Sequence, residues 1–214
     1  MHIDVLARRA LCALLLAAAT LAHAGLLDDF MLAVANDRGD AVRAMLARGV
    51  DPDSVDANGD PALAIAARAG SMHAAAALLA GKAKVDATNA FGDTPLMLAA
   101  LNGHLALAKA LRAAGANVNP HGWTPLAYAA TGGHDEIVRW LLSQGATVDA
   151  RSANGTTALM MAAREDRYAI ALLLIDSGAD VGARNQNNVS ALDFAQRNGD
   201  AKLVTRLQAA AARR

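Results

Sequence analysis

The chain is almost free of cysteine. The only one among its 214 residues is Cys12, which lies in an N-terminal segment unlike the rest of the sequence. Disulfides, thiolate nucleophiles and cysteine-ligated metals all require cysteine. The sequence after residue 24 therefore excludes all three.

A basic cluster is missing as well. The chain has 20 Lys and Arg and 20 Asp and Glu, so its formal net charge is zero. Proteins that bind nucleic acid normally carry a stripe of positive charge that neutralises phosphates. We therefore expect no nucleic-acid partner.

Sequence motifs for catalysis, metal binding and phosphate binding are absent too. The chain has no H-E-x-x-H, no serine within G-x-S-x-G and no glycine-rich phosphate loop. We therefore predict no catalytic residue, no metal and no cofactor. An enzyme assembled from His121, Asp93 and Arg151 is a remote alternative, because exposed turns enclose a reaction poorly.

The first 24 residues have the pattern of an export signal. Arg8 and Arg9 precede an apolar run over residues 10–21, and Ala22 and Ala24 are small residues at the positions that a signal peptidase inspects. The run is shorter than the roughly 20 residues that span a bilayer. We predict a signal peptide over 1–24 and a periplasmic or secreted mature protein, with twin-arginine export and a lipid anchor as open alternatives.

The remaining chain is a series of repeats. Six apolar anchor residues recur at intervals of 33, 33, 30, 33 and 33 residues: Phe30, Leu63, Leu96, Leu126, Leu159 and Leu192. Around the third anchor the chain reads Gly-Asp-Thr-Pro-Leu over 92–96, and around the fourth Gly-Trp-Thr-Pro-Leu over 122–126. An Ala-Ala pair and a Gly-His pair follow each of these two anchors.

These residues resemble the ankyrin repeat, whose period is about 33 residues and whose core reads T-P-L. The resemblance implies an all-α solenoid of about six helix-turn-helix units with short projecting turns. We assign the N-terminal cap to 25–53, four repeats to 54–86, 87–119, 120–149 and 150–182, and the C-terminal cap to 183–214.

Each unit carries signals for two helices. Thr94 is placed to cap the first helix of its unit, Gly103 to end it, and the second helix is predicted over 105–113. In the family a histidine often follows the anchor leucine and bonds the threonine hydroxyl. Here that position holds residues such as Met97 and Asp193, so we expect the network to be absent and apolar stacking to matter more.

The 30-residue interval marks an irregularity. Three residues are missing between Asn119 and Gly122, which leaves too little chain for a projecting turn. We predict a notch beside Trp123 that admits a partner, with simple variation in loop length as the alternative.

The resemblance implies that a partner meets the turn tips and the inner face of the first helices. The partner-binding residues predicted on this basis are Asn58, Asp60, Phe91, Asp93, Leu101, Asn102, His121, Trp123, Thr131, Arg151, Asn154, Arg164 and Arg184. Phe91 and Trp123 are the best candidate anchors, because large aromatic residues are enriched at binding hot spots. The alternative is that each folds back over its own turn.

Three other side chains and two histidines have expected structural roles. Met97 and Met160 are expected either to form an adaptable surface patch or to pack half-buried against neighbouring helices. Trp140 is expected to fill the core. His104 and His134 are expected to bond the backbone.

The leading hypothesis is a noncatalytic protein–protein interaction module that binds an envelope or periplasmic protein through its concave face and turn tips. An immunity or inhibitor protein against an exported toxin or enzyme is the main alternative. We expect a monomer that does not insert into the membrane once the signal is cleaved.

Overall fold

The computed structural model describes residues 25–212, which form an array of helix pairs. The predicted signal peptide over 1–24 and the last two arginines lie outside the described residues. The first unit pairs a helix over 25–35 with α2 (Gly39–Ala47). The later pairs are α3 (Ala62–Ala69) with α4 (Met72–Ala80), α5 (Pro95–Leu101) with α6 (Leu105–Ala113), α7 (Pro125–Gly132) with α8 (Asp135–Ser143), α9 (Ala158–Arg164) with α10 (Tyr168–Asp176), and α11 (Ala191–Asn198) with α12 (Ala201–Ala211). The all-α solenoid is confirmed.

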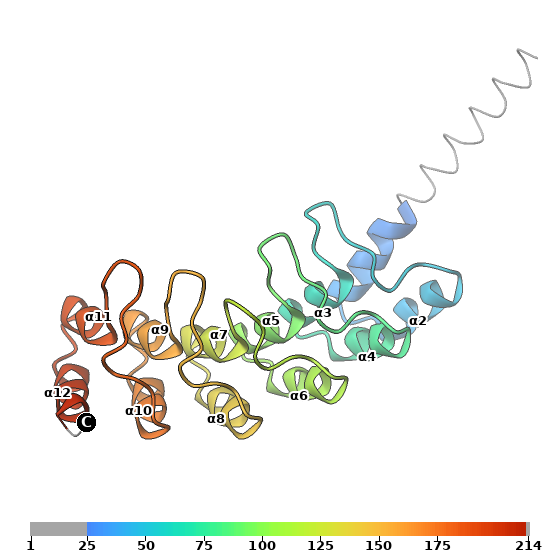
Figure 1. Cartoon of the computed structure of the whole chain (residues 1–214). Coiled ribbons are helices and arrows are strands. Elements are labelled where there is room, and N and C mark those ends of the chain that lie inside the picture. The colour runs from blue at the N-terminus through green and yellow to red at the C-terminus, as the bar shows by residue number, and fades with distance from the viewer. Residues whose placement is uncertain (1–24, 213–214) are drawn as a thin grey trace, which may run out of the picture.

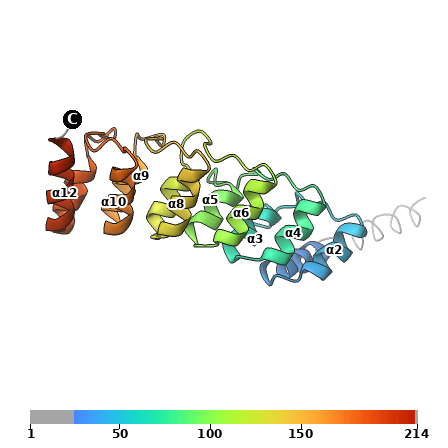
Figure 2. The same ribbon diagram turned by 90° about the horizontal axis from the view of Figure 1, so that it is seen from below.

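The helices form two rows. The first helices of successive units, α3, α5, α7, α9 and α11, lie side by side, and the second helices form a parallel row beside them (Figures 1 and 2). The connecting loops project beyond the row of first helices (Figure 1). The structure therefore has an elongated surface lined by loops and first helices.

The helix boundaries follow from local sequence. The Thr94 hydroxyl accepts a hydrogen bond from the Met97 backbone N–H at 3.3 Å, and Pro95 is the first residue of α5. Gly103 follows the helix with a φ of 81°, a left-handed conformation that glycine adopts without strain. The predicted helix start, helix end and second helix over 105–113 are all confirmed in this unit.

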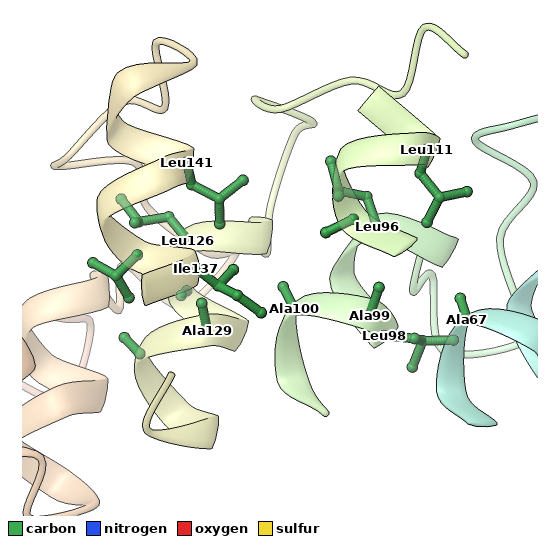
Figure 3. Close-up of a cluster of buried hydrophobic side chains, with 14 of the residues drawn as sticks. Ala67, Leu96, Leu98, Ala99, Ala100, Leu111, Leu126, Ala129, Ile137 and Leu141 are labelled. Carbon is green, nitrogen blue, oxygen red and sulfur yellow. The ribbon is translucent and has the colours of Figure 1, made fainter. Parts of the chain in front are cut away.

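The anchor residues and the alanine pairs build one continuous core. Leu96, Ala99 and Ala100 are completely buried, and Leu126 is nearly so (Figure 3). The small alanine side chains allow adjacent first helices to approach closely. Leu192 is only half-buried, because α11 is the last of the first helices within residues 25–212.

Met97 and Met160 belong to this core, with 2% and 1% of their surface exposed. The interpretation that they form an adaptable surface patch is wrong, because each side chain is enclosed beside an anchor leucine. Trp140 packs against the core but stays half-buried.

A first set of hydrogen bonds joins each interhelix turn to the unit before it. His104 Nε2 bonds the Arg68 carbonyl at 3.3 Å, and His134 Nε2 bonds the Leu101 carbonyl at 2.9 Å. The equivalent bonds run from Ser71 Oγ to the Ala35 carbonyl at 3.1 Å and from Arg167 Nε to the Thr131 carbonyl at 3.4 Å. The histidines bond backbone as expected, but the backbone belongs to the preceding unit.

A second set joins the units after their second helices. The Asp53 carboxylate accepts from the Lys84 N–H at 2.7 Å, and the Asp149 carboxylate accepts from the Asp180 N–H at 2.8 Å. Asp86 accepts from Asn117 at 3.1 Å, and Asn119 Oδ1 accepts from Thr147 at 2.8 Å. These acceptors follow the repeat spacing, so the stacking register continues across the shortened unit.

The expected loss of the bonds around the T-P-L threonine is only partly correct. Met97 Sδ accepts from the Thr94 N–H at 3.4 Å, in place of a histidine. The Asp193 carboxylate accepts from the Ser190 N–H at 2.8 Å and from its hydroxyl at 2.7 Å, and these bonds lower the pKa of Asp193. Two units therefore retain reciprocal bonds at the helix start with different chemistry.

Leu96→Ala is expected to lower the free energy of unfolding by about 2 to 5 kcal/mol, because it leaves a cavity in the continuous core. Chemical denaturation monitored by circular dichroism measures the loss. Leu32→Ala, which truncates a leucine that is 58% exposed, is the matched control. Equal stability of the two variants would contradict the repeat register.

Gly132→Ala is expected to destabilise the protein by about 1 to 3 kcal/mol through overpacking. A β-carbon at Gly132 would lie 2.3 Å from the Leu101 carbonyl oxygen, so the ends of α5 and α7 would have to separate. Gly182→Ala is the control, since its β-carbon would meet only Asp180 Oδ1 at 3.5 Å. Thermal unfolding compares the two, and an unchanged midpoint for Gly132→Ala would contradict the close approach.

Candidate functional site

The loop before α7 differs from the other projecting loops. In the second unit, Asn89 Oδ1 accepts from the Phe91 and Asp93 N–H groups, both at 2.9 Å, and closes a hairpin. Asp56 and Asn185 close the hairpins of their units with the same pattern. The loop before α7 is three residues shorter and rises less far than its neighbours (Figure 1).

A recess of about 220 Å³ opens beside this short loop. We call it the central recess, and it is lined by Leu101, Trp123, Tyr128, Thr131, Met161 and Arg164. These residues come from the end of α5, from the loop before α7, from α7 itself and from α9. The site therefore spans three consecutive units at the point where the repeat is interrupted.

Two aromatic rings form one side of the central recess. The centroids of Trp123 and Tyr128 are 6.2 Å apart, and the ring planes meet at 82° in an edge-to-face arrangement. The Tyr128 hydroxyl donates a hydrogen bond to Asp93 Oδ1, and Asn89 donates to Asp93 Oδ2 at 3.1 Å. The hairpin of the second unit thus holds the Tyr128 ring in place.

The pKa of Tyr128 lies well above its ordinary value. The main cause is burial, which disfavours the charged phenolate, and the hydrogen bond to Asp93 and its negative charge add to the effect. Tyr128 therefore remains a neutral hydrogen-bond donor at physiological pH.

Arg164 brings a positive charge to the edge of the central recess. Its Nε donates to Glu165 Oε1 at 2.8 Å, and about half of the Arg164 side chain is exposed. A guanidinium has five N–H groups, so this contact leaves it capacity for further hydrogen bonds and for a contact with a ring.

The structure brings four of the predicted partner-binding residues together in the central recess: Leu101, Trp123, Thr131 and Arg164. Asp93 lies behind it through its bond to Tyr128. The exposed side chains of Asn58, Asn102, His121 and Asn154 lie outside the lining.

Three other predicted residues take part in contacts within the array. Asp60 is only 7% exposed and pairs with Arg68 at 2.8 Å. Arg151 donates to the Arg184 carbonyl at 3.0 Å, and Arg184 forms an ion pair with Asp193 at 3.1 Å. These contacts hold the hairpins in position.

The two aromatic residues predicted to contact a partner, Phe91 and Trp123, differ in exposure. Phe91 is 87% exposed at the tip of its hairpin. Trp123 is half-buried and packs against the core and Tyr128. The alternative that the aromatic side chain folds back over its own turn is therefore correct for Trp123 and wrong for Phe91.

Tyr128 and Met161 are lining residues that the sequence analysis missed. Both stand two positions after an anchor leucine, where every full unit has a large apolar residue: Ile65, Leu98, Tyr128, Met161 and Phe194. That column lies on the row of first helices, so comparing positions across the repeats could have identified both residues.

Within residues 25–212, no group of three or more His, Cys, Asp or Glu side chains is arranged to hold a metal ion. The helices of the same region are all too short or too polar to cross a membrane.

Comparison with known families agrees with the geometry. The family model described as ankyrin repeats (3 copies) matches residues 30–121 and 114–185. The chain belongs to the ankyrin repeat family. Ankyrin repeats are generally protein–protein interaction modules, whose stacked units present an extended surface. A search of curated proteins finds no match to this ankyrin repeat chain.

The raised pKa of Tyr128 predicts a loss of stability at alkaline pH. An unfolded tyrosine ionises near pH 10, whereas folded Tyr128 keeps its proton, so the unfolded state binds fewer protons as the pH rises above about 10. The contribution of Tyr128 is thus present below pH 10 and declines above it.

The measurement is an ultraviolet titration of tyrosinate in a Tyr168→Phe background. The chain has two tyrosines, so this background reports Tyr128 alone. We expect the folded protein to ionise at a clearly higher pH than the same variant in denaturant. Coincident titration curves would contradict the buried bond to Asp93.

Proposed function

We propose that this ankyrin repeat protein is an exported, noncatalytic module that binds another protein of the cell envelope. The observation that carries the proposal is the central recess, where the shortened loop leaves an apolar opening among three first helices. The signal-peptide pattern over 1–24 supports a location outside the cytoplasm.

The surface around the central recess has the composition of a binding site. Hot spots are enriched in Trp, Tyr and Arg, and Trp123, Tyr128 and Arg164 all line the opening. Phe91 adds an exposed ring on the neighbouring hairpin. A partner that crosses the short loop would contact these four side chains together.

The experiment that tests the proposal is cross-linking of the protein in its native compartment, followed by mass spectrometry of the captured species. We expect one defined envelope protein, with cross-links that map to residues around the short loop and the adjacent hairpins. Cross-links confined to the second helices would contradict the proposed surface.

The double variant Phe91→Ala and Trp123→Ala is expected to weaken partner binding by about tenfold or more, the effect of losing a hot spot. Calorimetry with the captured partner measures the change, and circular dichroism verifies the fold. Leu32→Ala and Met72→Ala are matched controls, because both truncate exposed apolar residues elsewhere, 58% and 38% exposed. Equal affinity for the double variant and the controls would place the interface elsewhere.

A further inference from the structure

The central recess has the size of a single side chain. An apolar cavity of about 150 Å³ can hold one benzene molecule, and the central recess has about 220 Å³. A helix or a strand is far too large to enter it. The occupant is therefore one inserted group on a chain that runs over the opening.

The short loop before α7 leaves the central recess accessible to a partner segment. Each neighbouring loop carries a hairpin closed by a side chain, Asn89 on one side and Ser152 on the other. The loop before α7 is too short for such a hairpin. A partner segment can therefore pass between the two hairpins and reach Trp123 and Tyr128.

The lining favours an aromatic ring over an aliphatic side chain. The edge-to-face pair of Trp123 and Tyr128 offers ring faces and edges to a third ring, and aromatic pairs gain energy beyond their buried area. The thioether of Met161 interacts favourably with aromatic rings. The guanidinium of Arg164 can lie over a ring face, which carries negative charge density.

Three of the polar groups of the lining are already bonded within the protein. The Tyr128 hydroxyl donates to Asp93, Thr131 Oγ1 donates to the Ala127 carbonyl at 2.8 Å, and the Leu101 carbonyl accepts from His134. The walls are therefore held in place before any partner arrives, which reduces the entropy cost of binding. These three groups therefore offer little to a polar side chain, and the remaining charged group, the Arg164 guanidinium, lies at the edge of the central recess.

We propose that the central recess is an anchor site for one phenyl-sized aromatic side chain, presented by an extended segment of the partner protein. The inference deepens the proposed function and rests on it for the identity of the partner. The chemistry of the anchor can be tested without that partner.

The probes are N-acetyl-phenylalaninamide and N-acetyl-leucinamide, titrated into the isotope-labelled full chain and followed by nuclear magnetic resonance. The phenylalanine probe is expected to shift the Trp123 indole and the Met161 methyl resonances, and to leave the Trp140 indole in place. The leucine probe should bind roughly two- to tenfold more weakly, the range that an aromatic pair contributes.

Two variants test the location. Thr131→Phe places a ring of the protein itself in the central recess and is expected to abolish the shifts. Trp140→Phe, a conservative change at a half-buried aromatic residue outside the lining, should retain them. Circular dichroism verifies that both variants fold. Equal binding of the two probes, or binding that persists in Thr131→Phe, would overturn the proposal.

Sedimentation of the wild-type protein tests the competing occupant, Phe91 of a second copy. Concentration-dependent dimers that disappear in both Phe91→Ala and Thr131→Phe would assign the recess to self-association and overturn the proposal. A monomer at all concentrations supports it.

Failure of this inference can be separated from failure of the proposed function. A cross-linked partner that binds Thr131→Phe as tightly as wild type would overturn the aromatic anchor and leave the binding module in place. Selective binding of the phenylalanine probe without any cross-linked partner would support the anchor chemistry and contradict the envelope-binding function.

Discussion

Stacking of one unit on the next depends on satisfying the backbone groups that each helix end leaves unpaired. Side chains of the next interhelix turn supply donors to the carbonyls at the ends of the first helices, as His134 does for Leu101. Acidic or amide side chains accept hydrogen bonds from the backbone N–H groups that follow the second helices, as Asp149 does from Asp180. Because these bonds cross between units, they hold the stack in one register while the alanines and leucines provide the apolar contact.

These bonds depend on position and tolerate changes of residue type. Histidine, serine and arginine all donate from the interhelix turn, as Ser71 and Arg167 show. Lys82 and Asp166 adopt positive φ angles of 66° and 56° where other units use glycine. A side chain needs only a donor or acceptor of suitable reach to preserve the register, which explains how the fold persists through such variation.

The shortened third unit shows how this arrangement creates a site. Asn119 keeps the bond to the following unit, with Oδ1 accepting from the Thr147 N–H and Nδ2 donating to the Gly145 carbonyl at 2.9 Å. The missing residues are therefore lost from the loop and not from the stack. The helices stay in register, Gly132 permits α7 to approach α5, and the opening above Tyr128 remains uncovered by a hairpin.

The sequence by itself determined the repeat, its helix boundaries and the location of the irregular unit, because caps, helix-ending glycines and anchor leucines act over a few neighbouring residues. It also indicated Leu101, Trp123, Thr131 and Arg164 through their repeat positions. Only the tertiary structure decided that these four share one recess with Tyr128 and Met161, that Asp60 is buried against Arg68, and that Phe91 is exposed while Trp123 packs on Tyr128. Those outcomes depend on contacts between units about 30 residues apart, where side-chain volume and available partners, rather than local preference, determine which groups meet.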